Sequence, residues 1–269
     1  MIARICKLAL LSAVVACGCT RMAEPVTLDT EGVTPAVDYS HLAVVLDKAV
    51  NSDGLLLPKL LERHSERLDA QLRLLAVTGP TATPTLFKTP SEELAYWYNA
   101  RAAWAMKLAH LCNCPDEMER GELLDRSFPL DGRTMSLAAI DELLAARDDW
   151  RVLVASPDVT FSRSRLPAEP FTAADVEQRI AERISALVDD PQRFEIDIDH
   201  RRIRVPPMLW QYRQRLIAEH NRSYGTTGAN FITALLPHVQ GSAHRRLQDA
   251  TGYRVTSGRP SLLMAVLEQ

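Results

Sequence analysis

The sequence has few of the residues that usually mark a metal site. Only 5 of its 269 residues are cysteine, and two of them, Cys112 and Cys114, lie near His110. Zinc sites usually combine two ligand pairs with wider spacing, and the sequence holds no second cluster of this kind. We therefore predict no metal site and no cofactor.

Lysine is scarce as well. Of the 31 basic residues only 5 are lysine, and the 34 acidic residues leave a formal net charge of -3. A protein that binds nucleic acid usually presents a concentrated basic face to the phosphates. The charge balance therefore predicts no nucleic acid partner.

Catalytic motifs are missing too. The sequence has no Gly-x-Ser-x-Gly elbow, no glycine-rich phosphate loop and no His-Glu-x-x-His pair. Ser156, Ser162 and Ser164 follow a short apolar run, but no histidine lies between His110 and His200. A serine nucleophile needs a base, and we predict no catalytic residue in this loop.

Long apolar runs are absent except at the N-terminus. Arg4 and Lys7 precede the apolar run from Leu8 to Ala16, which is followed by small residues and cysteines. This order is typical of a secretory signal peptide, and the run is shorter than the roughly 20 residues that a membrane-spanning helix needs. Val14-Val15-Ala16-Cys17 resembles a bacterial lipobox. We predict a signal peptide over 1–16 and lipid attachment at Cys17, with Cys19 as the alternative.

Residues 17–37 show no periodicity and predict a flexible tether between the anchor and a folded domain over 38–269. In that domain apolar residues recur at helical spacing in several segments. We predict helices over 38–50, 58–77, 90–112, 136–147, 172–188, 207–221, 228–237 and 242–250.

Strand signals are fewer. Asp131-Gly132 lies between short extended arms and predicts a hairpin over 128–135. Alternating residues predict a second hairpin over 194–206 with His200 in its turn, and residues 252–258 predict a last strand. The run from Val152 to Ala155 also reads as a buried strand. Together these segments predict a helix-rich α+β single domain around a small antiparallel sheet.

Five segments in this order resemble the family called domain of unknown function 547 (DUF547). They are DYSHLAVVLDKAVNSDGLL, EELAYWYNARAA, LDGRTMSLAAIDELL, RVLVASPDVTFSRSRLP and RRIRVPPMLWQYRQRL. Tyr96, Trp97 and Asn99 match the family's aromatic helix, where Arg101 and Ala102 replace a Tyr and an Asn. The resemblance covers roughly residues 38–265. Trp97 is expected to be buried and Asn99 to hydrogen bond to the backbone of a neighbouring segment.

The sequence departs from the family where its reactive residues are expected. Glu142 and Leu153 stand at positions that usually hold His, while Asp158 and Arg163 stand at positions that usually hold Cys. A thiolate nucleophile is activated by a nearby imidazole, and a carboxylate with a guanidinium cannot replace that pair. Cysteine chemistry of the kind the resemblance would imply is therefore not expected here.

Two functional hypotheses follow. The first is a lipid-anchored protein of the bacterial cell envelope, facing the periplasm or the exterior, whose domain binds a protein or small-molecule ligand without catalysis. The second is a hydrolase-like enzyme with a rearranged active site. Its candidate cleft would be formed by Asn99, Glu142, Ser156 and Asp158. A convergence of these four residues with a histidine would favour the enzyme.

Overall fold

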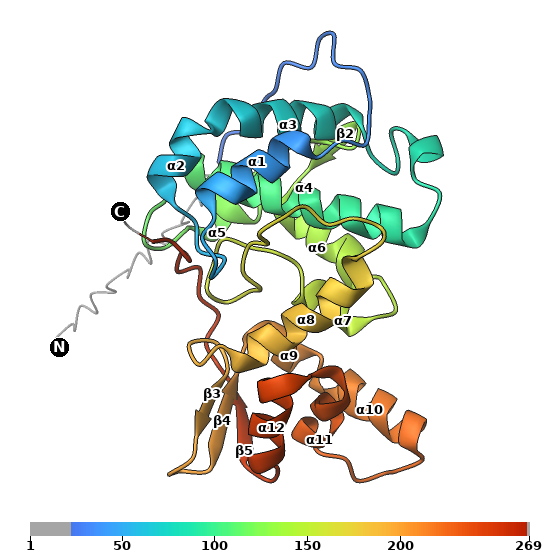
Figure 1. Ribbon diagram of the computed structural model, residues 1–269, viewed down its shortest axis with the longest axis vertical. Helices are drawn as coiled ribbons and strands as arrows, with labels where there is room; N and C mark the ends of the chain where they lie inside the picture. The colour runs from blue at the N-terminus through green and yellow to red at the C-terminus, as the bar shows by residue number, and fades with distance from the viewer. Residues whose placement is uncertain (1–22, 268–269) are drawn as a thin grey trace, which may run out of the picture.

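A computed structural model describes residues 23–267 of the chain. Its helices form two tiers, one above the other, and helix α8 joins them (Figure 1). The described part contains 12 α-helices and 5 short strands, so the expected helix-rich α+β fold is confirmed. Buried apolar residues from both tiers belong to one continuous core.

The first tier is almost entirely helical. Its elements are α1 (Ser40–Ala49), α2 (Pro58–Arg63), α3 (Ser65–Val77), η1 (Pro84–Leu86), α4 (Pro90–Leu111), α5 (Arg120–Leu123), β1 (Phe128–Leu130), β2 (Arg133–Met135), α6 (Leu137–Ala145) and α7 (Trp150–Val154). The expected helix over 58–77 is divided at His64, whose backbone leaves the helical region between α2 and α3.

The second tier combines short helices with a sheet. Its elements are α8 (Val176–Asp189), β3 (Glu195–Asp197), β4 (Arg202–Val205), α9 (Pro207–Gln211), α10 (Arg213–Tyr224), α11 (Phe231–Leu235), η2 (Leu236–His238), α12 (Gly241–Asp249) and β5 (Arg254–Ser257). In the described part of the chain, no helix has both the length and the apolar character that a bilayer crossing requires.

Helix α4 is the centre of the first tier and packs against α2, α3, α5, α6 and α8. Its first turn is held by a capping box, in which Thr89 accepts a hydrogen bond from the backbone of Glu92 and the Glu92 carboxylate accepts one from Thr89. Almost every residue from Leu94 to Ala109 is buried. A helix that is buried on all sides can place polar groups only where other segments satisfy them.

The strands form two separate sheets. β1 and β2 are an antiparallel hairpin, and Asp131 and Gly132 in its turn have φ angles of 56° and 70°, as a type I′ turn requires. The second hairpin, β3 and β4, is also as expected, and His200 is exposed in its turn. β5, however, pairs parallel to β4. The chain can return in this direction because α9 to α12 lie between the two strands in sequence.

The run from Val152 to Ala155 is not a strand, so that prediction was wrong. It belongs to α7, where the Asp149 side chain caps the helix by accepting a hydrogen bond from the backbone of Arg151 at 2.9 Å. A short apolar run that is buried on all sides has the same pattern in a strand and in a helix. Asp149, which lies before the run and acts as an N-cap, is the residue that indicates a helix instead of a strand.

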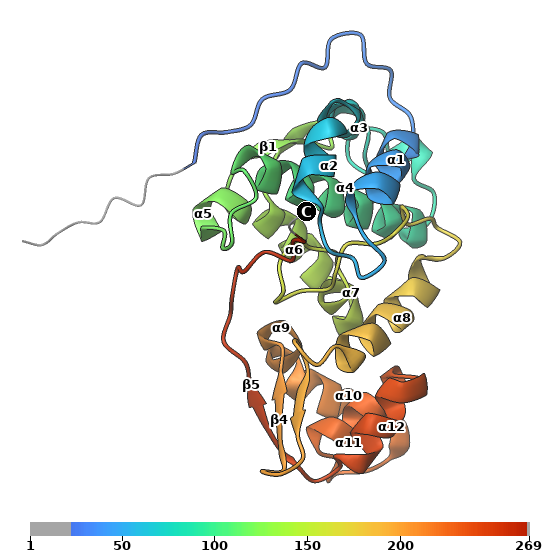
Figure 2. The same ribbon diagram turned by 60° about the vertical axis from the view of Figure 1, so that its left-hand side comes forward.

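Both ends of the described chain lie against the first tier. The segment 23–39 runs over its helices as extended chain, and the Val26 amide donates to the Ser127 carbonyl at 2.8 Å (Figure 2). After β5 the chain climbs back along the first tier, and the Leu56 amide donates to the Ala265 carbonyl at 2.8 Å. The predicted signal peptide over 1–16 and the lipid attachment residues Cys17 and Cys19 lie outside the described residues.

Candidate functional site

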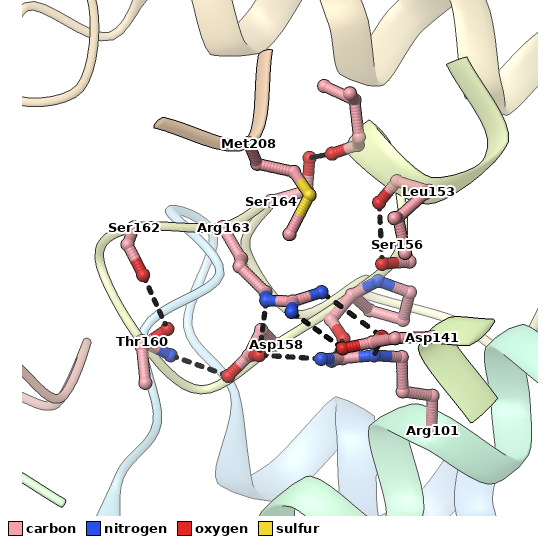
Figure 3. A network of polar contacts seen from close by, with 12 residues as sticks. Arg101, Asp141, Leu153, Ser156, Asp158, Thr160, Ser162, Arg163, Ser164 and Met208 are labelled. Atoms are coloured by element: carbon pink, nitrogen blue, oxygen red, sulfur yellow. Dashed lines mark hydrogen bonds and ion pairs between the residues drawn. The ribbon is translucent and has the colours of Figure 1, made fainter. Parts of the chain in front are cut away.

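The two positions where the resemblance expects cysteine, Asp158 and Arg163, belong to a cluster of four charged residues (Figure 3). Arg101 comes from α4 and Asp141 from α6, while Asp158 and Arg163 come from the loop that follows α7. We call these four residues the ion-pair cluster. It joins the centre of the first tier to the loop that leads towards α8.

Arg101 bridges the two carboxylates. Its Nε lies 2.8 Å from Asp141 Oδ1 and its Nη2 lies 2.9 Å from Asp158 Oδ2. Its Nη1 donates to the carbonyl of Pro157. All three nitrogens of this guanidinium therefore have partners, as a buried arginine requires.

Arg163 closes the cluster from the other side. Its Nη1 and Nη2 donate to the two carboxylate oxygens of Asp141 at 3.1 and 2.6 Å, the paired geometry that arginine forms with a carboxylate. Its Nε lies 3.4 Å from Asp158 Oδ2. The other oxygen of Asp158 accepts the Thr160 amide at 3.0 Å. Two positive and two negative charges thus neutralise one another.

The cluster is largely shielded from solvent. The side chains of Arg101 and Asp158 are 0% and 1% exposed, and those of Asp141 and Arg163 are 13% and 12% exposed. Burial alone would raise the pKa of Asp141, but the charges of Arg101 and Arg163 outweigh it and hold this pKa below its usual value. Burial and the charge of Arg101 lower the pKa of Arg163.

This electrostatic arrangement does not suit acid–base catalysis. A general base works best when its pKa lies near the operating pH. The pKa of Asp141 is moved in the opposite direction, and both oxygens of its carboxylate accept hydrogen bonds from arginine. The geometry suits a scaffold that holds the loop after α7 against α4 and α6.

The serines of the loop hydrogen bond to protein atoms that cannot activate them. Ser156 Oγ donates to the Leu153 carbonyl at 2.8 Å and Ser164 Oγ donates to the Val154 carbonyl at 3.0 Å. Ser162 Oγ lies 3.3 Å from the hydroxyl of Thr160. Within residues 23–267 no hydrogen bond joins any of these serines to a histidine.

The four residues of the candidate cleft are not brought together. Ser156 and Asp158 are buried in the loop after α7, whereas Glu142 is exposed on α6. Asn99 faces another segment, donating to the Phe171 carbonyl at 2.9 Å and accepting the Phe171 amide at 2.8 Å. The predicted backbone partner of Asn99 and the burial of Trp97, which is 5% exposed, are both confirmed.

The sequence reasoning missed Asp141 and assigned no role to Arg101. Asp141 lies four residues after Leu137 and next to Ile140, both buried, so helical periodicity places it at the edge of the buried face. Glu142 is one position farther round, on the exposed face. Glu142 was the predicted cleft residue instead, because the resemblance expects a histidine at its position.

The described cysteines, Cys112 and Cys114, carry free thiols after α4. Burial raises the pKa of Cys114 to about 11, and burial with the neighbouring Glu122 also raises the pKa of Cys112. Little thiolate therefore forms at neutral pH. The residues that the structure describes hold no group of three or more side chains that could bind a metal ion.

No family model matches the sequence, and neither a curated protein nor a solved structure matches it.

Proposed function

We propose that this protein is a bacterial lipoprotein, held at a membrane of the cell envelope through Cys17, and that its folded domain binds a ligand or a protein partner without covalent chemistry. The lipobox-like run that ends at Cys17 supports the anchor. The resemblance to the DUF547 family remains part of this hypothesis.

The ion-pair cluster is the observation that supports a role without covalent chemistry. At two positions where the resemblance expects cysteine, Asp158 and Arg163 neutralise each other together with Arg101 and Asp141. Nucleophilic catalysis needs a side chain that a neighbouring base can deprotonate. Charges that are fully paired and buried instead maintain the shape of the domain.

The anchor is tested by metabolic labelling with a fatty acid analogue. We expect Cys17→Ala to abolish labelling and to leave either an unlabelled soluble form or an uncleaved precursor. Cys19→Ala is the matched control, because it removes a thiol two residues away, and it should leave labelling unchanged. Labelling that survives Cys17→Ala but is lost in Cys19→Ala would move the attachment site to Cys19.

The absence of covalent chemistry is tested on the detergent-solubilised full-length protein with serine-directed and thiol-directed probes, followed by mapping of adducts by mass spectrometry. We expect no stoichiometric adduct on Ser156, Ser162 or Ser164. An adduct on one of them that disappears when a particular histidine is replaced would refute the proposal and support the alternative, a hydrolase-like enzyme with a rearranged site.

A further inference from the structure

An open groove with a volume of about 780 Å³ runs along α8 between the turn at 52–55 and the segment 164–168. The turn lies very close to that segment at Gly54. A Cβ on Gly54 would lie 2.6 Å from Arg165 Cβ and 2.7 Å from the Leu166 carbonyl oxygen, and its φ of +72° also favours glycine. Close contact of two backbone segments thus forms one end of the groove.

Four arginines line this groove: Arg165, Arg179, Arg183 and Arg193. Arg165 and Arg193 share one carboxylate, Asp190, at 3.2 and 2.8 Å. Because two arginines share one carboxylate, Arg165, Arg193 and Asp190 together carry a net positive charge. The Nη1 of Arg165 is buried and has no hydrogen bond partner.

Each of the other three arginines forms an ion pair with a carboxylate. Arg183 differs, because no ion pair to Arg183 occurs among residues 23–267. Its Nε donates to the Ala155 carbonyl at 2.7 Å and its Nη2 donates to the Arg165 carbonyl. Both partners are neutral. Burial, together with the positive charges of Arg179 and Arg193, lowers the pKa of Arg183 to about 9, and burial lowers that of Arg193 to about 10.

The other acidic residues of the groove bind elsewhere or are exposed to solvent, although the charge of Asp53 does act on Arg165. Asp189 accepts the hydroxyl of Ser242 at 2.6 Å and lies 3.7 Å from Arg246. Glu182 accepts from Gln178 at 2.7 Å and is exposed to solvent, as is Asp53. Charges that are exposed to water are strongly screened, whereas partly buried cations are screened much less.

We propose that the groove binds a small anion through a carboxylate or phosphate group, with Arg183 as its main partner and Arg165 as the second. An oxyanion would supply the negative charge that Arg183 lacks and an acceptor for the free Nη1 of Arg165. Charge-assisted hydrogen bonds from arginine to such groups are short and strong. A volume of about 780 Å³ fits a small-molecule ligand. This inference rests on the proposed binding role and names the ligand class for it.

The test titrates the detergent-solubilised full-length protein at low salt with inorganic phosphate and with citrate, using calorimetry. We expect saturable one-site binding of at least one of the two anions, and the tighter one indicates whether the natural ligand carries phosphate or carboxylate. Arg183→Gln should weaken that binding about tenfold or more, as expected when a charged hydrogen-bond partner is lost, and Arg183→Lys should weaken it less.

Arg126→Gln is the matched control. Arg126 is also largely buried and donates both to a backbone carbonyl, that of Glu24, and to a side chain, but it lies outside the groove. The Arg126→Gln protein should bind the anion as tightly as the wild-type protein does. If Arg183→Gln does not fold, Arg165→Gln provides the second groove variant and should also weaken binding, because it removes the Nη1 that has no partner.

Absence of saturable binding to both anions, or equal binding by the Arg183→Gln and Arg126→Gln proteins, would overturn the anion site. Either result would leave lipid labelling and the unreactive serines as they are, so the proposed function would stand. A histidine-dependent serine adduct would remove the proposed function without changing the titration. The two failures are therefore distinguishable.

Discussion

At the scale of single residues, the molecule places two of its arginines in contrasting surroundings. Arg101 is fully buried and contacts two carboxylates, whereas Arg183 donates to two carbonyl groups and lies over the Phe171 ring at 5.5 Å. Burying a charge is costly unless an opposite charge lies beside it. The first environment is complete without a ligand and the second is not, which is why we assign structure to one and binding to the other.

The ion-pair cluster makes stability depend on Asp141. We expect Asp141→Asn to lower the free energy of unfolding at neutral pH by about 3–5 kcal/mol, because it leaves Arg101 and Arg163 with one carboxylate between them. Urea denaturation measures this change. The control is Asp125→Asn, an exposed partner of Arg120 at 3.3 Å, for which we expect less than about 1 kcal/mol.

The same substitution has a defined pH dependence. The pKa of Asp141 is lower in the folded protein than its usual value of 3.8, so the folded state binds this proton more weakly than the unfolded state. The ionised Asp141 carboxylate therefore contributes its full stabilisation of the fold above its pKa in the unfolded chain. This stabilisation is lost as the pH falls below about 3.8 towards the lower pKa of the folded protein. Wild-type stability should therefore fall more steeply in this acid range than that of Asp141→Asn. If the unfolding free energies of the two proteins fell in parallel over this pH range, the lowered pKa of Asp141 would be contradicted.

How far the sequence predicts the site is seen by comparing Asn99 with Asp141. Asn99 lies within a helix of apolar neighbours, so a buried amide with a backbone partner follows from the need to satisfy it. The partners of Asp141 come from segments 40 and 22 residues away, and only the fold brings them together. The positions of Asp158 and Arg163 were identified, but their mutual pairing was not.

At the scale of elements, α4 contacts the chain before α8 at Phe171, through the hydrogen bonds of Asn99 and through the ring of Tyr98, which packs edge-on against the Phe171 ring at 4.9 Å. Asn99 accepts the amide and donates to the carbonyl of Phe171, and both residues are fully buried. The Asn99 side chain thus pairs with both backbone groups of Phe171, as the backbone of a neighbouring strand would. It holds the segment before α8 at a fixed place on α4.

Asn99→Ala should therefore leave two backbone groups of Phe171 without partners. Each buried unsatisfied group costs about 1–3 kcal/mol, so we expect a loss of at least about 2 kcal/mol in unfolding free energy. Hydrogen exchange of the Phe171 amide should also become faster. Gln178→Ala on the exposed face of α8 is the control, with a change within about 0.5 kcal/mol. An unchanged exchange rate of the Phe171 amide would contradict this role of Asn99.

The helices were predictable where their apolar residues recurred over a long segment, as in α3 and α8. Other features of the elements were not, among them the division of the expected helix over 58–77 at His64. α7 is too short for periodicity to separate a helix from a strand, and the parallel pairing of β5 with β4 depends on how α9 to α12 fold between them. Local sequence carries little information about such long-range pairing.

At the scale of the whole molecule, the last described residues tie the two tiers together. After β5 the chain leaves the second tier and passes beside three segments of the first (Figure 2). The carbonyls of Leu262, Leu263 and Ala265 accept the amides of Met118, Phe161 and Leu56 at 3.0, 2.9 and 2.8 Å. Met264 and Ala265 are buried. One extended segment therefore holds three loops, including the loop of the ion-pair cluster.

Removal of residues 260–269 should loosen these three loops while the second tier stays folded. We expect faster hydrogen exchange at the amides of Leu56, Met118 and Phe161, because each loses its acceptor, and a fall of at least about 2 kcal/mol in unfolding free energy, as expected when a buried Met side chain is lost. The Arg254 amide, which donates to the Arg201 carbonyl at 3.0 Å inside the second tier, is the internal reference and should keep its exchange rate. If the three amides stay protected in the shortened chain, the C-terminal segment is not what holds the first-tier loops in place, and their order must come from the ion-pair cluster and the core of α4 alone.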